Sequence, residues 1–199
     1  MTLSVVELYT DGSSIKNPGL SGYGFIVKYT VDDPDNPSVP KFVEVEKNQG
    51  YRFSTNNRME LMAAINGVRC VLDLVRSGVI KGCTQLNLFS DSEYLCNAVN
   101  KKWINKWMDN NWMTSGFGGK SPSPIKNRDL WEEILKTQSE SRELQINLTF
   151  NWVKGHETNE MNNRADELAV AASTGINHII DEVFEGSSGM IPKVGNNIR

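Results

Sequence analysis

The sequence has few residues that could bind a soft metal ion or form disulfide bonds. Its 199 residues include three cysteines and two histidines. The cysteines, Cys70, Cys83 and Cys96, are odd in number and form no CxxC pair, which argues against a disulfide framework and a thiolate zinc site. Since only His156 and His178 remain as nitrogen ligands, any bound metal must rely on oxygen, which favours Mg²⁺ or Mn²⁺.

The sequence also lacks a long apolar run. Crossing a bilayer takes roughly 20 apolar residues, and no segment approaches that length. The N-terminus does not have the basic and then apolar layout of a signal peptide. We therefore expect a soluble, cytoplasmic, monomeric protein with no membrane partner. Its 39% of hydrophobic residues can bury one substantial core, with little room for a second full domain.

Net positive charge is missing as well. The formal net charge of -3 argues against a protein that coats nucleic acid through bulk charge. One segment departs from this balance, because six basic residues between Lys101 and Arg128 stand against a single acid, Asp109. This local asymmetry predicts a polyanionic partner.

The periodicity of apolar residues predicts an α/β fold. Strands are expected over 3–9, 22–31, 41–51, 86–91 and 144–153, and helices over 61–75, 93–100, 128–139 and 162–173. Three strands come first and two more then alternate with helices, which predicts a mixed five-stranded sheet flanked by helices. We expect one domain over residues 1–174. Residues 175–199 are expected to form a C-terminal tail that docks one short helix.

Four acids stand where polar residues are least expected. Asp11 and Asp91 end apolar strands. Glu60 opens the long helix, and Asp166 adjoins the apolar face of the last one. Each acid alone fits a turn, a helix cap or an exposed charge in a first helical turn. Together they predict a converging cluster at the strand ends, and because such carboxylates repel one another at low dielectric, we expect divalent cations to neutralise them.

Short motifs follow one another in a characteristic order along the chain. They are TDGS at 10–13, NPG at 17–19, TNNRMEL at 55–61, SDS at 90–92, WVKGH at 152–156 and RADELA at 164–169. The ordered set resembles type 1 ribonuclease H over roughly 5–172, although a tripeptide such as SDS would be weak by itself. The resemblance implies the ribonuclease H-like fold. It also implies an endonuclease that cuts the RNA strand of an RNA·DNA hybrid.

The resemblance assigns roles to residues of the acidic cluster. It implies that Asp11, Glu60, Asp91 and Asp166 are the ligands of two Mg²⁺ ions, for which Mn²⁺ could substitute. The family reaction leaves a 5′-phosphate and a 3′-hydroxyl. His156 is implied as a mobile group for proton transfer or product release, whereas its surroundings alone indicate an ordinary loop histidine.

Telling RNA from DNA requires groups that contact the 2′-hydroxyl. The resemblance assigns this contact to Asn17, Asn56, Asn57 and Glu60, together with the backbone near Ser14. An asparagine amide suits the task because it both donates and accepts hydrogen bonds. Each asparagine also fits a simpler role in a turn or a helix cap.

The basic segment resembles a protrusion found in some family members, and we call residues 101–126 the handle. The handle residues implied in substrate binding are Lys101, Lys102, Trp103 and Lys106, while Thr55, Lys126 and Asn127 are implied in a phosphate pocket for the DNA strand. Trp103 and Trp107 share a helix face, so core packing is the alternative for them. The chain departs from some relatives at Glu93, where they carry an amide, and in the less basic turn at 109–111.

Other functions are open at this point. A DNA-processing nuclease of the same fold would reuse the clustered carboxylates, and the asparagines argue against it. A non-catalytic module that binds hybrids would not need all four acids. A purely structural protein fits the sequence least well.

Overall fold

A computed structural model of the chain describes residues 4–31, 41–116, 121–155 and 159–189. The strands are β1 (Ser4–Ser14), β2 (Gly19–Val31), β3 (Lys41–Ser54), β4 (Cys83–Ser90), β5 (Asn147–Trp152) and β6 (His178–Ile179). The helices are α1 (Asn56–Arg76), α2 (Glu93–Asn100), α3 (Trp103–Asp109), α4 (Arg128–Glu143), α5 (Glu160–Thr174) and α6 (Glu182–Ser187). None of the helices in these ranges is long and apolar enough to cross a membrane.

The strands form one mixed sheet in the order β5-β4-β1-β2-β3-β6. Strands β1, β2 and β3 pair antiparallel, whereas β4 pairs parallel with both β1 and β5. The predicted mixed α/β sheet is therefore confirmed. The sheet has a sixth strand, β6, beyond the five predicted. This strand was not predictable, because two residues are too few to show an alternating pattern.

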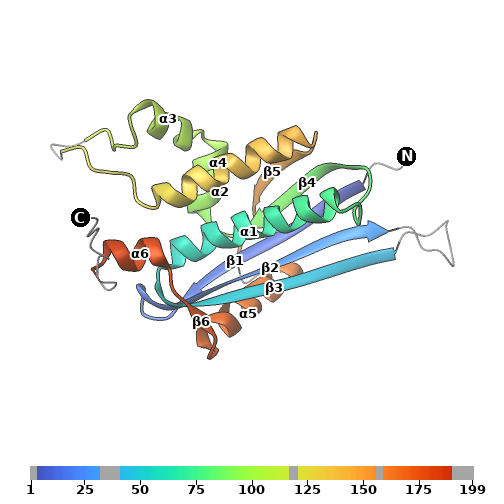
Figure 1. The fold of residues 1–199 in the computed structure, drawn as a ribbon, viewed down its shortest axis with the longest axis horizontal. Coiled ribbons are helices and arrows are strands. Elements are labelled where there is room, and N and C mark those ends of the chain that lie inside the picture. Colours follow the sequence, from blue (N-terminus) through green and yellow to red (C-terminus); the bar gives the residue numbers. More distant parts are fainter. Residues whose placement is uncertain (1–3, 32–40, 117–120, 156–158, 190–199) are drawn as a thin grey trace, which may run out of the picture.

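Helices cover both faces of the sheet, with α1 on one face and α5 on the other (Figure 1). Leu8 of β1 faces α1, and a Cβ atom at Gly67 would lie 2.6 Å from its Cδ1 atom. The next residue, Tyr9, packs with Ile26 and Ala165 on the α5 side. Successive side chains of a strand point to opposite faces, so β1 contributes to the core on both sides.

Strand β1 extends farther than the sequence pattern predicts. Its parallel pairing with β4 reaches Tyr9, opposite Phe89. Its antiparallel pairing with β2 continues, and Asp11 lies opposite Gly24. Asp11 is thus inside a strand, not at its end, because β2 still supplies hydrogen-bonding partners where β4 no longer does. It nevertheless lies just past the last parallel pair, on the side where β4 ends.

A buried ion-pair network ties the C-terminal segment to the start of α1. The Arg58 side chain donates from Nε to Asp181 Oδ2 at 2.6 Å and from Nη1 to Asp129 Oδ1 at 3.0 Å. Arg58 and Asp181 are 2% and 3% exposed, respectively. Ser54 also donates to Asp181. Residues from β3, α1, α4 and the segment before α6 therefore meet around one guanidinium group.

Replacing Asp181 with alanine should lower the free energy of unfolding by about 3 kcal/mol, because the buried Arg58 charge loses one of its two carboxylate partners. Urea unfolding followed by circular dichroism measures the change. The control is Glu182→Ala, an exposed acid in the first turn of α6, which should cost less than about 1 kcal/mol. Equal losses in the two variants would contradict the special role of the Arg58 network.

Candidate active site

Three carboxylates that are distant in sequence meet beside the end of β4. They belong to Asp11 on β1, Glu60 in the second turn of α1 and Asp91, which directly follows β4. Each offers one oxygen atom, and these three atoms all lie within 4.8 Å of one another. Asp11 and Glu60 are buried and Asp91 is half-buried. We call these residues the acidic triad.

Local structure holds two members of the acidic triad in place. The backbone N–H of Gly12 donates to Asp11 Oδ1 at 2.6 Å. A Cβ atom at Gly12 would lie 2.5 Å from the backbone nitrogen of Glu60, so the glycine lets β1 approach α1 closely. The Asn56 side chain donates to Glu60 Oε1 at 3.3 Å. The other oxygen, Glu60 Oε2, is buried without a hydrogen-bond partner in the described part of the chain.

The electrostatics of the acidic triad favour an added positive charge. Burial, followed by the charge of Asp91, raises the pKa of Asp11 from 3.8 to about 8. Burial also raises the pKa of Glu60 well above its usual value, with further contributions from Asp11 and Asp91. Bringing several negative charges into a low-dielectric site is costly, and a cation bound among them would offset that cost.

The fourth predicted acid, Asp166, stands outside the group of atoms that lie within 4.8 Å of one another. It is half-buried on α5, on the opposite side of the sheet from α1. Its charge still contributes to the raised pKa of Asp11, after burial and Asp91. Asp166 is therefore within electrostatic reach of the acidic triad.

Two of the predicted asparagines are linked to the triad by hydrogen bonds. The Asn17 side chain accepts a bond from the backbone N–H of Asn56 at 3.1 Å, and the Asn56 amide in turn bonds Glu60. Asn57 is exposed beside them. The simpler role is also present nearby, because the side chain of Thr55 caps α1 by accepting from the N–H of Arg58.

The predicted Ser14 lies at the end of β1, where its hydroxyl accepts a hydrogen bond from Ser21 at 2.8 Å. Its partner Ser21 is buried, and the Gly19 carbonyl, 2.9 Å from the Ser21 hydroxyl, is the alternative acceptor for the single proton of that group. Either bond closes the turn that carries Asn17. Ser21 was not predictable from the sequence, because a buried serine in an apolar strand has no distinctive local pattern.

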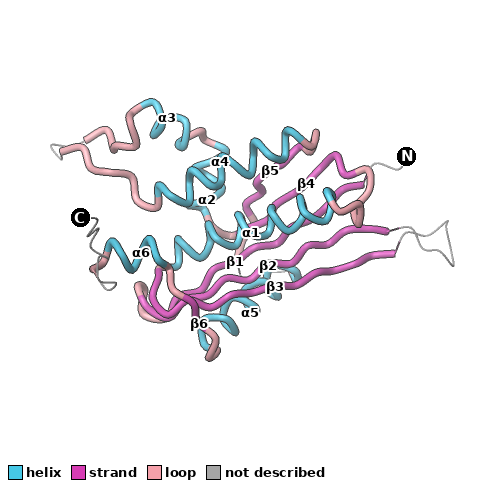
Figure 2. The backbone as a smooth tube through the Cα atoms, viewed as in Figure 1, coloured by secondary structure: helices cyan, strands magenta, loops and turns pink. Residues whose placement is uncertain are grey.

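The described residues of the handle, 101–116 and 121–126, include α3 and lie away from the sheet (Figure 2). Lys101, Lys102 and Lys106 are exposed. Trp103 and Trp107 are partly buried against the core, and the Trp107 ring lies 5.4 Å from that of Trp131. Core packing, the alternative for both tryptophans, is thus present in the structure.

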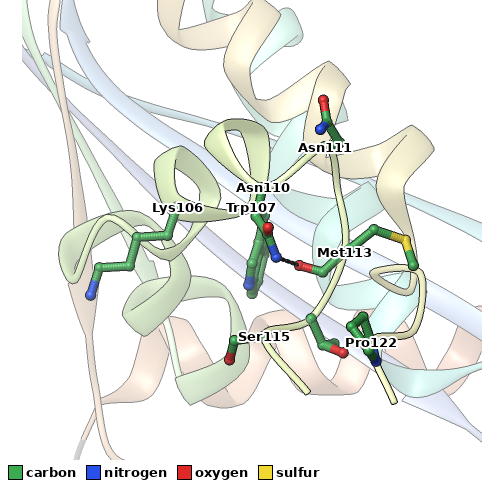
Figure 3. Close-up of a pocket in the computed structure, with 8 residues that line it drawn as sticks. Lys106, Trp107, Asn110, Asn111, Met113, Ser115 and Pro122 are labelled. Carbon is green, nitrogen blue, oxygen red and sulfur yellow. Dashed lines mark hydrogen bonds between the residues drawn. The ribbon is translucent and has the colours of Figure 1, made fainter. Parts of the chain in front are cut away.

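A pocket opens between α3 and the segment that follows it, and Figure 3 shows Lys106 extending away from Trp107 at this place. The Asn110 amide donates to the Met113 carbonyl at 2.8 Å and so holds the turn closed. None of the residues that line the pocket belongs to the acidic triad. Lys106 is the one basic residue among the described residues that line the pocket.

The two residues predicted to assist Thr55 lie immediately before α4. Lys126 is exposed, and the half-buried Asn127 donates to the Tyr94 hydroxyl at 3.4 Å. Tyr94 also accepts from the indole of the fully buried Trp131 at 3.1 Å. These bonds anchor Asn127 to the core. The predicted His156 lies outside the described residues.

The residues of the chain match the sequence model of a known family. The model described as RNase H matches residues 4–174. The chain belongs to the ribonuclease H family. The match confirms the family that the ordered motifs indicate, and it covers every element from β1 through α5.

Relatives of this ribonuclease H domain support the assignment. Ribonuclease H of Desulforamulus reducens is 38% identical over 171 residues, which cover 86% of this chain and 89% of the relative. Ribonuclease HI of Synechocystis is 36% identical over 183 residues, or 92% and 96% of the two chains. Among solved structures, LC9-RNase H1, described as a type 1 RNase H, shares the fold with a TM-score of 0.64 and 22% identity over 94% of this chain and 82% of that one.

The acidic triad of this ribonuclease H fits a divalent metal ion. The donors are carboxylate oxygens, which suit hard cations. One of them, Glu60 Oε2, is buried without a partner in the described ranges. Because both raised pKa values in the triad reflect unfavourable negative charge, a cation would stabilise the ionised site. Asp11, Glu60 and Asp91 could therefore hold a metal.

Proposed function

We propose that this ribonuclease H hydrolyses the RNA strand of RNA·DNA hybrids at internal positions and leaves 5′-phosphate and 3′-hydroxyl ends. One observation carries the proposal: hydrogen bonds join Asn17 to Asn56 and Asn56 to Glu60. Amides suited to a 2′-hydroxyl are thereby attached to the acidic triad. An enzyme that cuts RNA selectively must position the 2′-hydroxyl and the neighbouring phosphate together.

Comparison with known proteins supports this substrate. LC11-RNase H1, whose solved structure is a complex with an RNA/DNA hybrid, has the same fold as this chain, with a TM-score of 0.53 and 21% identity over 84% of this chain and 95% of that one. The matches to the ribonuclease H relatives at 38% and 36% identity cover 89% and 96% of the length of those relatives. The proposed activity is that of the family.

Each part of the site has a role in this proposal. Two Mg²⁺ ions, or Mn²⁺ in their place, held by Asp11, Glu60, Asp91 and Asp166 would supply Lewis-acid chemistry for phosphodiester hydrolysis. Asn17, Asn56 and Asn57, with the backbone at Ser14, bind the RNA strand near its 2′-hydroxyl groups. His156 transfers a proton or assists product release. Thr55, Lys126 and Asn127 bind a phosphate of the DNA strand.

Incubating the protein with four end-labelled substrates tests the proposal. These are an RNA·DNA hybrid, an RNA duplex, a DNA duplex and single-stranded RNA, all of one sequence, with and without Mg²⁺. We expect the RNA strand to be cleaved only in the hybrid and only when metal is present. Phosphatase treatment should change the mobility of the downstream RNA fragments, which would show that cleavage leaves 5′-phosphate ends.

The same assay separates the two alternatives. Cleavage of the DNA duplex at a comparable rate would identify a DNA-processing nuclease. Binding of the hybrid in a mobility-shift assay, without cleavage under any metal, would identify a non-catalytic binding module. Either result would overturn the proposed function.

The handle is proposed to bind the hybrid through its exposed lysines. Replacing Lys101, Lys102 and Lys106 together with glutamine should weaken hybrid binding and reduce the slope of log K against log salt by about one unit per lost phosphate contact. The turnover number at saturating substrate should stay nearly constant. Fluorescence anisotropy across a salt series, with a melting curve for each variant, gives both quantities.

A matched variant controls for the loss of three charges. Lys41, Lys81 and Lys136 are exposed and lie outside the handle, so their replacement with glutamine should leave the salt slope unchanged. Lys101 Nζ lies 5.7 Å from the centre of the Trp103 ring, so the handle lysines could instead stabilise the packing of the tryptophans. A handle variant that melts earlier but keeps its affinity and salt slope would show that the lysines only support tryptophan packing.

Three further assignments belong to the proposal. The catalytic domain spans residues 1–174 and is followed by the C-terminal segment 175–199, of which residues 175–189 are attached to the domain through the Arg58 network. The protein acts as a monomer in the cytoplasm. Sedimentation equilibrium in the presence and absence of hybrid tests the monomeric state.

A further inference from the structure

The loop that follows β5 borders one member of the acidic triad. At the end of β5, Trp152 lies opposite Ser90, the last residue of β4. One residue later, the backbone N–H of Val153 donates to the Ser90 carbonyl at 3.0 Å. The backbone just before Asp91 is therefore attached to this loop. We call residues 152–155, which are the last residue of β5 and the start of the loop, the Asp91 loop, and they continue past the carboxylate.

The first contact of the Asp91 loop is made by an indole N–H group. Trp152 Nε1 donates to the backbone carbonyl of Asp91 at 3.0 Å. The Trp152 side chain is 49% exposed, so burial in the core does not account for its position. An indole has a single donor, and here that donor is used to hold the peptide group of a proposed metal ligand.

The second feature of the Asp91 loop is the lack of a side chain at Gly155. A Cβ atom there would lie 2.4 Å from Asp91 Oδ2 and 3.3 Å from its Cγ atom. The first distance is far too short for a non-bonded contact, so the carboxylate would have to turn away or the loop would have to move. Gly155 does not have a positive φ, so the need for glycine is one of space, not of backbone conformation.

This glycine differs from those that only allow helix and sheet to pack. Gly22 and Gly24 meet backbone and side-chain atoms of α5, such as Ser173 and Leu168. Gly155 meets a carboxylate whose oxygen lies within 4.8 Å of its counterparts on Asp11 and Glu60. A change at Gly155 therefore acts directly on the geometry of the acidic triad.

We infer that Trp152 and Gly155 are positioning residues that set the orientation of Asp91 toward Asp11 and Glu60. Trp152 holds the Asp91 backbone, and Gly155 leaves the space that the carboxylate occupies. The inference rests on the proposed function, because it takes Asp91 to be a metal ligand. Neither residue needs to touch the substrate for this role.

The main test is the affinity of the Gly155→Ala variant for Mn²⁺, measured by electron paramagnetic resonance of free Mn²⁺ without substrate. We expect the affinity to fall at least about tenfold and kcat to fall by a similar or larger factor, since small displacements of catalytic groups have large effects. KM for the hybrid should change by less than about threefold, because binding contacts are kept. Gly186→Ala is the control, as a Cβ there meets nothing within 4 Å.

A second variant tests the same inference without adding an atom. Trp152→Phe keeps a ring at the surface and removes only the N–H, so Mn²⁺ affinity should fall roughly fivefold, as for the loss of one hydrogen bond. The control is Trp131→Phe, which loses an indole bond to Tyr94 at 3.1 Å. Trp131→Phe should melt at a lower temperature and bind Mn²⁺ as the wild type does.

A double variant shows whether Gly155 acts through Asp91. In the Asp91→Asn background, Gly155→Ala should cause no further loss of Mn²⁺ affinity, because effects at directly coupled sites are not additive. Full additivity would mean that Gly155 acts elsewhere and would overturn the inference. Normal Mn²⁺ affinity and normal kcat in both Gly155→Ala and Trp152→Phe would overturn it as well.

Failure of the inference can be told apart from failure of the proposed function. If the wild type cleaves hybrids and the two loop variants behave normally, only the inference is wrong. If the wild type binds Mn²⁺ more tightly than the loop variants but cleaves no hybrid, the proposed function is wrong and the positioning role stands.

Discussion

Replacing Asp11 with asparagine should abolish hybrid cleavage, with a loss of at least about 10³-fold, while the fold stays intact. Asparagine has the same shape but no negative charge, so the site loses one of the two buried carboxylates of the triad. Charge stabilisation by bound metal is worth several kcal/mol, and its loss accounts for the expected magnitude. Cleavage of a labelled hybrid at saturating Mg²⁺, with circular dichroism as a check on folding, measures the effect.

The same variant should be more stable than the wild type when metal is removed. Burial and Asp91 raise the pKa of Asp11 from 3.8 to about 8, so the folded state holds this proton more tightly than the unfolded state does. The contribution of the Asp11 carboxyl to the stability of the wild type is therefore fully present below about pH 4 and is lost as the pH rises toward about 8. The asparagine side chain of the variant does not titrate, so the gain in melting temperature should be small at pH 4 and largest at pH 8.

The size of the expected gain in stability of Asp11→Asn follows from the raised pKa of Asp11. One pKa unit corresponds to about 1.4 kcal/mol, so the gain at pH 8 should be on the order of a few kcal/mol. Asp73→Asn, at an exposed position on α1, is the control and should alter neither cleavage nor the pH dependence. Normal turnover in Asp11→Asn, or a gain that does not depend on pH, would contradict the account of the triad.

Removing divalent metal should eliminate cleavage and leave a folded protein. The core is apolar and does not depend on the acidic triad, so chelation should preserve the circular dichroism spectrum. Restoring Mg²⁺ or Mn²⁺ should restore activity and raise the melting temperature, because an ion present at 100 times its Kd stabilises the fold by about 2.7 kcal/mol. Calorimetry and the cleavage assay on the same sample test both effects.

A requirement for zinc would contradict the prediction that an oxygen-ligated metal serves this site. The triad offers carboxylate oxygen atoms only, and the cysteines of the described chain are free. Zinc should therefore be unnecessary for folding. A stoichiometric zinc ion whose removal unfolds the protein would show that the oxygen-ligand argument is wrong. The Asp11→Asn variant should lose the stabilisation by Mg²⁺ that the wild type shows.

Much of the fold was predictable because it depends on local patterns. Leu61, Ile65, Val68 and Leu72 recur at helical spacing, and all four are buried in α1 as that spacing requires. The long strands contain apolar residues in alternation or in short runs, because successive side chains of a strand point to opposite faces of the sheet. The sixth strand and the Arg58 network were not predictable, since the first has two residues and the second joins Arg58 to a carboxylate 123 positions away.

Part of the candidate site was likewise predictable from the sequence, and part depends on the fold. The amino-acid sequence alone shows which residue types are available: four acids next to apolar segments, amides in the nearby motifs, and too few cysteines and histidines for a soft metal site. Chemical identity is carried by each residue, so no structure is needed to read it. The ordered motifs likewise determined the family.

The distances between these groups depend on the folded structure. It brings Asp11, Glu60 and Asp91 within 4.8 Å and leaves Asp166 outside that group. It places Asp11 inside β1 and leaves, at Gly155, the space that the Asp91 carboxylate fills. Distances, burial and the resulting pKa values depend on how β1, α1, β4 and the Asp91 loop pack, and packing is a property of the folded chain as a whole, which no local pattern of residues contains.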